Sequence, residues 1–125
     1  MLTTVATALA GLVGVAVIFM GALPFWAPRA AAGFGIPDTP TEDRSFRAWL
    51  TVKAMRDLAC GLFVFVLLVG GTPHLLGWFI LVMAVIPAGD ALIVLRSNGP
   101  KATAYGVHGA TAAVMLAISV PLLIA

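Results

Sequence analysis

The sequence predicts an all-α integral membrane protein, in which residues 1–125 form a single antiparallel bundle of four transmembrane helices. Hydrophobic residues make up 62% of the chain and charged residues only 10%. Soluble domains are about half apolar and about a quarter charged, so this chain has too few polar residues to cover a water-facing exterior. Four apolar segments also have the length of a membrane-spanning helix. The lipid bilayer is therefore the expected environment of the chain.

The helices are expected where an apolar segment reaches the roughly 20 residues that cross a bilayer core of about 30 Å. They are predicted at residues 2–23, 40–69, 75–96 and 101–124, with an interfacial loop at 24–39. The first segment carries no charge, and a cleaved signal peptide is the alternative for it. No basic region precedes it, however, and its apolar stretch is longer than such peptides usually carry. The connections between the later helices are short, which favours antiparallel neighbours.

Local signals place the ends of these helices. Aromatic and proline residues at 24–26 end the first helix at the membrane interface, and residues 28–34 are predicted to form one interfacial turn that ends in glycine. Thr39 and Glu42 have the spacing of a capping box, so the second helix is expected to begin near residue 40. Residues 97–100 are predicted to form the turn between the last two helices.

Basic residues predict the orientation in the cell membrane. The N-terminus, residues 70–74 and the C-terminus carry no lysine or arginine, whereas the two other connections carry Arg29, Arg44, Arg47, Arg96 and Lys101. Because lysine and arginine are enriched in cytoplasmic loops, we expect a multi-pass protein with both termini outside the cytoplasm.

Small residues recur four apart on the first helix, as Thr7 with Gly11 and Ala10 with Gly14. Such spacing lets membrane helices approach closely. Packing within the chain is the preferred interpretation, and a seam between two copies in a homodimer is the alternative.

Ionisable residues also lie inside the apolar segments, namely Lys53, Arg56, Asp57, Asp90 and His108. A charge at such a depth costs at least a few kcal/mol on insertion scales. A rise of about 1.5 Å per residue places these groups from three helices in one slab of the membrane, in its cytoplasmic half.

Helical periodicity places the same residues on three polar faces, which we expect to point to a common interior. These faces are Trp49, Lys53, Arg56, Asp57 and Cys60 on the second helix, Phe79, Met83, Pro87, Asp90 and Val94 on the third, and Tyr105, His108, Ala112, Met115 and Ser119 on the fourth. Pro87 also frees the carbonyl group of Met83, which is tolerated in a membrane only against protein or water.

Two interpretations of these faces compete. The structural one is an ion-pair network, in which Lys53 pairs with Asp57, Arg56 reaches Asp90 and His108 completes the set. The functional one is a pocket for a lipophilic small molecule, with catalytic candidates Asp57, Asp90 and His108 and ligand-binding candidates Trp49, Lys53, Arg56 and Tyr105. Intramembrane ionisable residues mark functional sites by default, and a carboxyl group in an apolar site suits acid–base isomerisation or cyclisation.

Other function classes fit the sequence less well. A small proton-coupled transporter and a non-catalytic accessory subunit stay as alternatives, and the sequence leaves open whether the protein is an enzyme. No metal or cofactor is expected, because one histidine and two aspartates on separate helices are a poor ligand set. A net charge of +2 without a basic patch gives no reason to expect nucleic acid.

Four short motifs resemble those of a bacterial and fungal family of small four-helix membrane proteins of unknown function, whose architecture is similar to that of DoxX-like proteins. They are Phe34-Gly35-Ile36-Pro37, Arg56-Asp57-Leu58-Ala59 with Gly61, Pro87 with Asp90, and His108-Gly109. The resemblance covers about residues 10–120. It implies a four-helix membrane fold and marks Arg56, Asp57, Asp90 and His108 as the family's polar positions, but it implies no activity.

Overall fold

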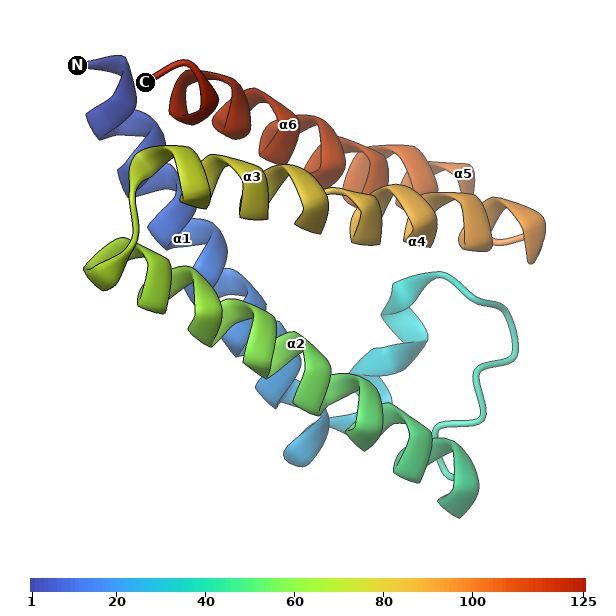
Figure 1. The fold of residues 1–125 in the computed structure, drawn as a ribbon. Helices are drawn as coiled ribbons and strands as arrows, with labels where there is room; N and C mark the ends of the chain where they lie inside the picture. The colour runs from blue at the N-terminus through green and yellow to red at the C-terminus, as the bar shows by residue number, and fades with distance from the viewer.

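A computed structural model describes all 125 residues, and every regular element in it is helical (Figure 1). The α-helices are α1 (Leu2–Ala22), α2 (Arg44–Gly70), α3 (Pro73–Met83), α4 (Val85–Arg96), α5 (Lys101–Thr103) and α6 (Ala110–Leu123). Two short 3₁₀ helices, η1 (Leu23–Phe25) and η2 (Pro28–Phe34), follow α1, and a π-helical segment, η3 (Ala104–Gly109), joins α5 to α6.

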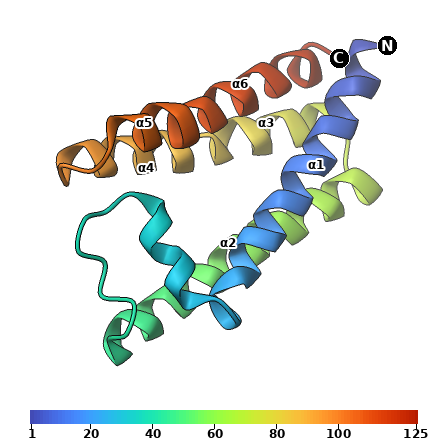
Figure 2. The same cartoon turned by 180° about the vertical axis from the view of Figure 1, so that it is seen from behind.

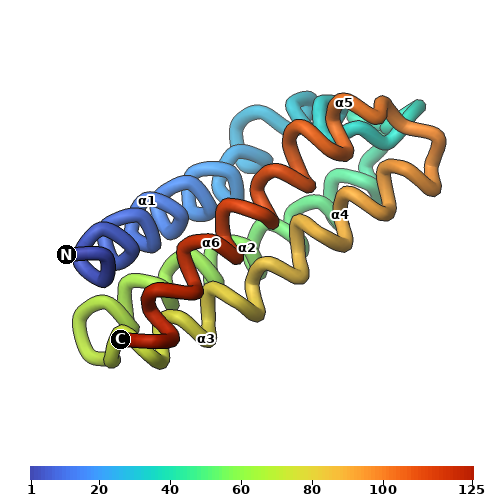
Figure 3. The backbone as a smooth tube through the Cα atoms, turned by 90° about the horizontal axis from the view of Figure 1, so that it is seen from above, coloured from blue at the N-terminus to red at the C-terminus, as the bar shows by residue number.

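The helices form two antiparallel pairs. One pair is α1 with α2, and the other is the α3–α4 rod with the rod of α5, η3 and α6 (Figures 1 and 2). The pairs lie close together at the end that holds both termini and diverge toward the other end, where the connection between α1 and α2 lies between them (Figures 1 and 2). Seen from above, the two termini share one end of the molecule (Figure 3).

Three helical segments are long and apolar enough to cross a membrane, namely Leu2–Phe25, Pro73–Arg96 and Lys101–Leu123. Helix α2 is as long, at 27 residues, but carries Lys53, Arg56 and Asp57. Many large apolar side chains also point outward, among them Leu12, Phe19 and Val82 at 58–64% exposure. An apolar outer surface of this kind suits lipid rather than water. The chain is a membrane protein.

The small residues of α1 pack against α2 within the chain. Gly14 is buried, and a Cβ atom added to it would lie 3.0 Å from the Phe65 ring. A Cβ atom added to Gly61 would lie 2.6 Å from Cγ1 of Ile18. Glycine therefore sets the close approach of α1 and α2 on both sides of the contact.

Helix α2 begins at Arg44, later than the capping-box prediction placed it. Asp43 is the N-cap residue, and its carboxylate accepts a hydrogen bond of 2.7 Å from the Phe46 backbone N–H. The Thr39 hydroxyl instead donates to the Ile36 carbonyl, and Glu42 binds arginine side chains. The predicted capping box is wrong, because both of its side chains have partners in the connection itself.

The third and fourth apolar segments are less regular than expected. The third breaks at Ala84 into α3 and α4. Pro87 explains this break, because it has no N–H to donate to the Met83 carbonyl. The fourth segment contains η3, and such π-helical turns are rare and occur frequently at functional sites. Residues 28–34 form the expected short helical segment, η2, which ends before Gly35, whose φ of 110° is left-handed.

Candidate intramembrane polar site

Lys53 and Asp57 form an ion pair one turn apart on α2. The Lys53 Nζ atom lies 2.6 Å from Oδ2 of Asp57, and the two side chains are 51% and 24% exposed. This pair matches the one expected in the ion-pair interpretation. Because its charges have opposite sign, each lowers the cost of placing the other in an apolar environment.

His108 lies on η3 and is buried, with 8% exposure. Its Nε2 atom is 2.8 Å from the Phe34 carbonyl oxygen. A carbonyl oxygen can only accept, so Nε2 carries the hydrogen in this contact. The imidazole and Phe34 rings are also in contact, with centroids 4.4 Å apart and planes tilted by 47°. The end of η2 is therefore held on η3 through both backbone and side chain.

Phe34 links this histidine to the cation of α2. The Lys53 Nζ atom lies 5.8 Å from the centroid of the Phe34 ring, within the range of a cation–π contact. The ring is thus in contact with His108 on one helical pair and with Lys53 on the other. The connection between α1 and α2 joins the two pairs at the end where they diverge.

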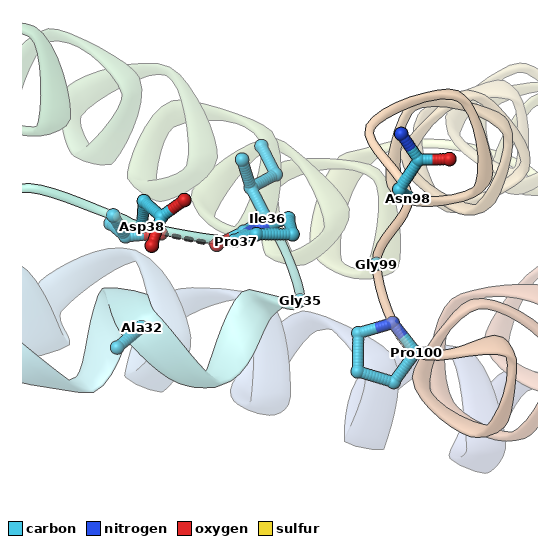
Figure 4. Close-up of a pocket in the computed structure, with 9 residues that line it drawn as sticks. Ala32, Gly35, Ile36, Pro37, Asp38, Asn98, Gly99 and Pro100 are labelled. Carbon is cyan, nitrogen blue, oxygen red and sulfur yellow. Dashed lines mark hydrogen bonds between the residues drawn. The ribbon is translucent and has the colours of Figure 1, made fainter.

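Gly35 and Gly99 fix the position of this connection. A Cβ atom added to Gly99 would fall 2.1 Å from the Gly35 carbonyl oxygen, and one added to Gly35 would meet Val94 and Thr103 at 3.1 and 3.0 Å. Figure 4 shows Gly35 opposite Gly99, at the turn that precedes α5. No larger residue fits at either position without moving the connection.

Asp90 lies half-buried on the face of α4 that carries Pro87 and Val94, both buried. Helix α4 packs on η3, the segment that carries His108. Asp90 makes no side-chain hydrogen bond and no ion pair, since the three ion pairs of the chain are formed by other residues. Asp90 is the polar group in this region that lacks a protein partner.

Three other residues that were predicted to line the polar site lie outside it. Trp49 and Tyr105 are 72% and 62% exposed. Arg56 is exposed and donates to the Val52 carbonyl on its own helix at 3.1 Å. The expected pair of Arg56 with Asp90 is therefore absent. Periodicity alone assigned these residues to the interior, but α2 buries the face of Ala54 and Val64 against α1.

Among the seven surface hollows of the molecule, two lie elsewhere and are not lined by the predicted ligand-binding or catalytic residues. One, of about 510 Å³, lies between residues 32–39 and 98–100 (Figure 4). The other, of about 350 Å³, is lined by Val13 on α1 and by residues of η3 and α6. The first is flanked by Asp38 and Asn98, both with left-handed backbone conformations.

An exposed ion-pair group joins the start of η2 to the start of α2. The Glu42 carboxylate binds Arg29 at 2.6 Å and Arg47 at 3.0 Å. The hydrogen bond from Arg29, together with the positive charges of Arg29 and Arg47, lowers the pKa of Glu42. These contacts hold the start of η2 and the start of α2 together at an exposed surface.

Sequence reasoning missed Phe34 as a member of the site. Helical periodicity cannot reveal it, because Phe34 belongs to the connection and not to a membrane-spanning segment. The available signal was the motif Phe34-Gly35-Ile36-Pro37, in which a phenylalanine precedes a glycine in the left-handed conformation.

The family described as a domain of unknown function (DUF4267) matches residues 14–122. The chain belongs to this family. The match includes every residue of the polar site, from Phe34 to His108. The description of the family assigns no activity, so the role of the site has to come from its chemistry. No curated protein and no solved structure matches the chain significantly.

Proposed function

We propose that the protein binds a lipophilic small molecule with a polar group at the site formed by Lys53, Asp57, Asp90 and His108. The observation that carries this proposal is the Asp90 carboxylate, which lies half-buried in an apolar helix without a hydrogen-bond or ion-pair partner. An ionisable group in an apolar segment costs at least a few kcal/mol, and intramembrane ionisable residues mark functional sites by default. A bound molecule that donates to this carboxylate explains why it is kept.

The chemistry of the site suits proton transfer. Asp90 has free oxygens that can accept or donate a proton, and the Nε2–H group of His108 can hydrogen-bond a carbonyl oxygen. Isomerisation or cyclisation of a lipophilic molecule is the reaction class that these groups fit. The Lys53–Asp57 pair is charge-neutral as a unit, and its role is to bind and orient the polar end of the molecule.

The proposed setting is a cell membrane that the chain crosses four times, with both termini outside. Two features of α2 support a fourth crossing of the membrane. The helix carries no charged residue after Asp57, and it is as long as the other three segments. Arg56 favours the same orientation, because its guanidinium bonds toward Val52 and so reaches toward the basic end of the helix. The site then opens toward the cytoplasmic half only, which favours a binding site over a transport path.

Mass spectrometry of molecules that co-purify with the protein tests the proposal. The wild-type protein and Asp90→Asn would be isolated in nanodiscs made directly from the membranes of the expressing cells. We expect at least one lipophilic compound that is enriched on the wild-type protein and reduced about tenfold on Asp90→Asn, because the amide cannot act as an acid or base and has one acceptor oxygen instead of two.

Asp38→Asn is the matched control, since Asp38 is an exposed aspartate outside the polar site. It should leave the enriched compound unchanged. If all three proteins carry the same molecules in the same amounts, Asp90 is not part of a binding site.

A further inference from the structure

We propose that Phe34 occupies the place of the ligand, and that the site takes a flat conjugated ring bearing a carbonyl group. Residues 28–36, here called the cover segment, then have to move aside before such a molecule can bind. This inference rests on the proposed function and adds to it the chemical class of the ligand.

The contacts of Phe34 define that class. Its carbonyl oxygen accepts a hydrogen bond from His108 Nε2 at 2.8 Å, and its ring contacts the same imidazole in a tilted arrangement at 4.4 Å. The face of the ring also lies 5.8 Å from the Lys53 ammonium group. A donor, an aromatic ring and a cation therefore converge on one ring and one carbonyl oxygen. A free molecule with these two features meets the same three partners.

Asp90 is not used by Phe34. It makes no hydrogen bond or ion pair, and it lies on α4, which packs on the η3 segment that carries His108. A ligand can therefore offer something that the phenylalanine does not, namely a hydroxyl or a second polar group directed at Asp90. This difference favours the ligand over the cover segment once the ligand is present.

The cover segment is held by contacts that can be broken one by one. It contains only a short 3₁₀ helix, whose hydrogen bonds have poorer geometry than those of an α-helix. Its Arg29 is 79% exposed in the pair with Glu42, and exposed pairs contribute little. Gly35 packs on Gly99 without a side chain on either residue. Segments with few buried side chains open at low free energy.

Binding of 2-acetylnaphthalene tests the inference, with 2-ethylnaphthalene as the ligand that has the ring but no carbonyl oxygen. Equilibrium dialysis of the radiolabelled compounds against nanodiscs, with and without protein, separates binding from partition into lipid. We expect Phe34→Ala to bind 2-acetylnaphthalene about tenfold more tightly than the wild type, the factor that one aromatic pair and one cation–π contact correspond to together. Binding of 2-ethylnaphthalene should stay weaker on the same variant.

Three further variants make the outcome interpretable. Phe34→Leu keeps an apolar side chain if the alanine variant fails to fold, and should also bind the ketone more tightly than the wild type. Phe46→Ala changes a half-buried phenylalanine outside the cover segment and should leave binding unchanged. Adding His108→Ala to Phe34→Ala should abolish the preference for the ketone over the hydrocarbon.

The result that overturns the inference is equal binding of 2-acetylnaphthalene to folded Phe34→Ala, Phe34→Leu and wild-type protein. Phe34 is then only a structural contact. The proposed function stands or falls separately, on the loss of a co-purified compound in Asp90→Asn.

Discussion

Gly35 and Gly99 carry the tightest backbone contact of the polar site. The Gly99 position leaves no room for a Cβ atom, since it would fall 2.1 Å from the Gly35 carbonyl oxygen. That contact determines where Phe34 lies, because Phe34 directly precedes Gly35. Two residues without side chains thus position the one aromatic ring that bridges Lys53 and His108.

A Gly99→Ala substitution should therefore lower the free energy of unfolding by about 1–3 kcal/mol, as overpacking generally does. Thermal unfolding in detergent measures this loss. Gly33→Ala is the matched control in the same connection, because a Cβ atom at Gly33 meets nothing within 4 Å. We expect the control to stay within about 0.5 kcal/mol of the wild type. Equal stability of both variants would show that close packing of the cover segment on Gly99 does not stabilise the fold.

At this scale the sequence predicted part of the polar site. Lys53 and Asp57 form the expected ion pair, whereas Arg56, expected to pair with Asp90, bonds to its own helix. Trp49 and Tyr105 were assigned to the same interior and are exposed. Periodicity gives the angle of a side chain around its helix, but not which of two neighbouring helices that angle faces.

The elements of the chain depart from their local sequence signals at the start of α2 and in η3. Asp43 caps α2, while Glu42 is held by Arg29 and Arg47. The capping-box pattern of Thr39 and Glu42 did not reveal this competition, because Arg29 lies 13 residues before Glu42. The π-helical segment η3 was also not predictable, since apolar periodicity does not distinguish it from an α-helix.

The Glu42 contacts should make the connection sensitive to acid. The pKa of Glu42 is lowered in the folded protein, chiefly by the hydrogen bond from Arg29. Its stabilising contribution is therefore present above the unfolded pKa of about 4.3 and is lost as the pH falls through the lower folded value. The difference in unfolding temperature between wild type and Glu42→Gln measures this contribution.

That difference should be constant from about pH 7 to pH 5 and should shrink toward zero as the pH is lowered further below 4. Asp38→Asn is the control for a carboxylate of the same connection without an ion pair. A difference that stays the same across the whole range would mean that Glu42 does not stabilise the folded state through its charge.

The whole molecule consists of two helical pairs that diverge, which differs from a bundle of uniform thickness. Composition and segment length were enough to predict an all-helical membrane protein, and three segments have the length and apolarity to cross. The divergence was not predictable, because it depends on the connection between α1 and α2. The sequence of that segment predicts an interfacial loop, but in the structure the segment lies between the two helical pairs (Figures 1 and 2).

The orientation of the molecule gives the prediction at this scale. Both termini lie at the same end of the molecule as residues 70–74, a connection that carries no lysine or arginine. They should therefore face away from the cytoplasm. A phosphatase fused after Ala125 should be active, and a green fluorescent protein at the same place should stay dark. A fusion inserted at residue 98 should give the opposite pattern. A fluorescent C-terminal fusion would reverse the orientation and place the polar site on the outer side.

The contact between His108 and Phe34 also bears on how the protein is made. The two residues are 74 positions apart, so Phe34 emerges from the ribosome well before its partner has been synthesised. Until then Phe34 can contact Lys53 on α2 but not His108. Synthesis of the last helix therefore completes the site, and a chain that stops before His108 would leave it without its cover.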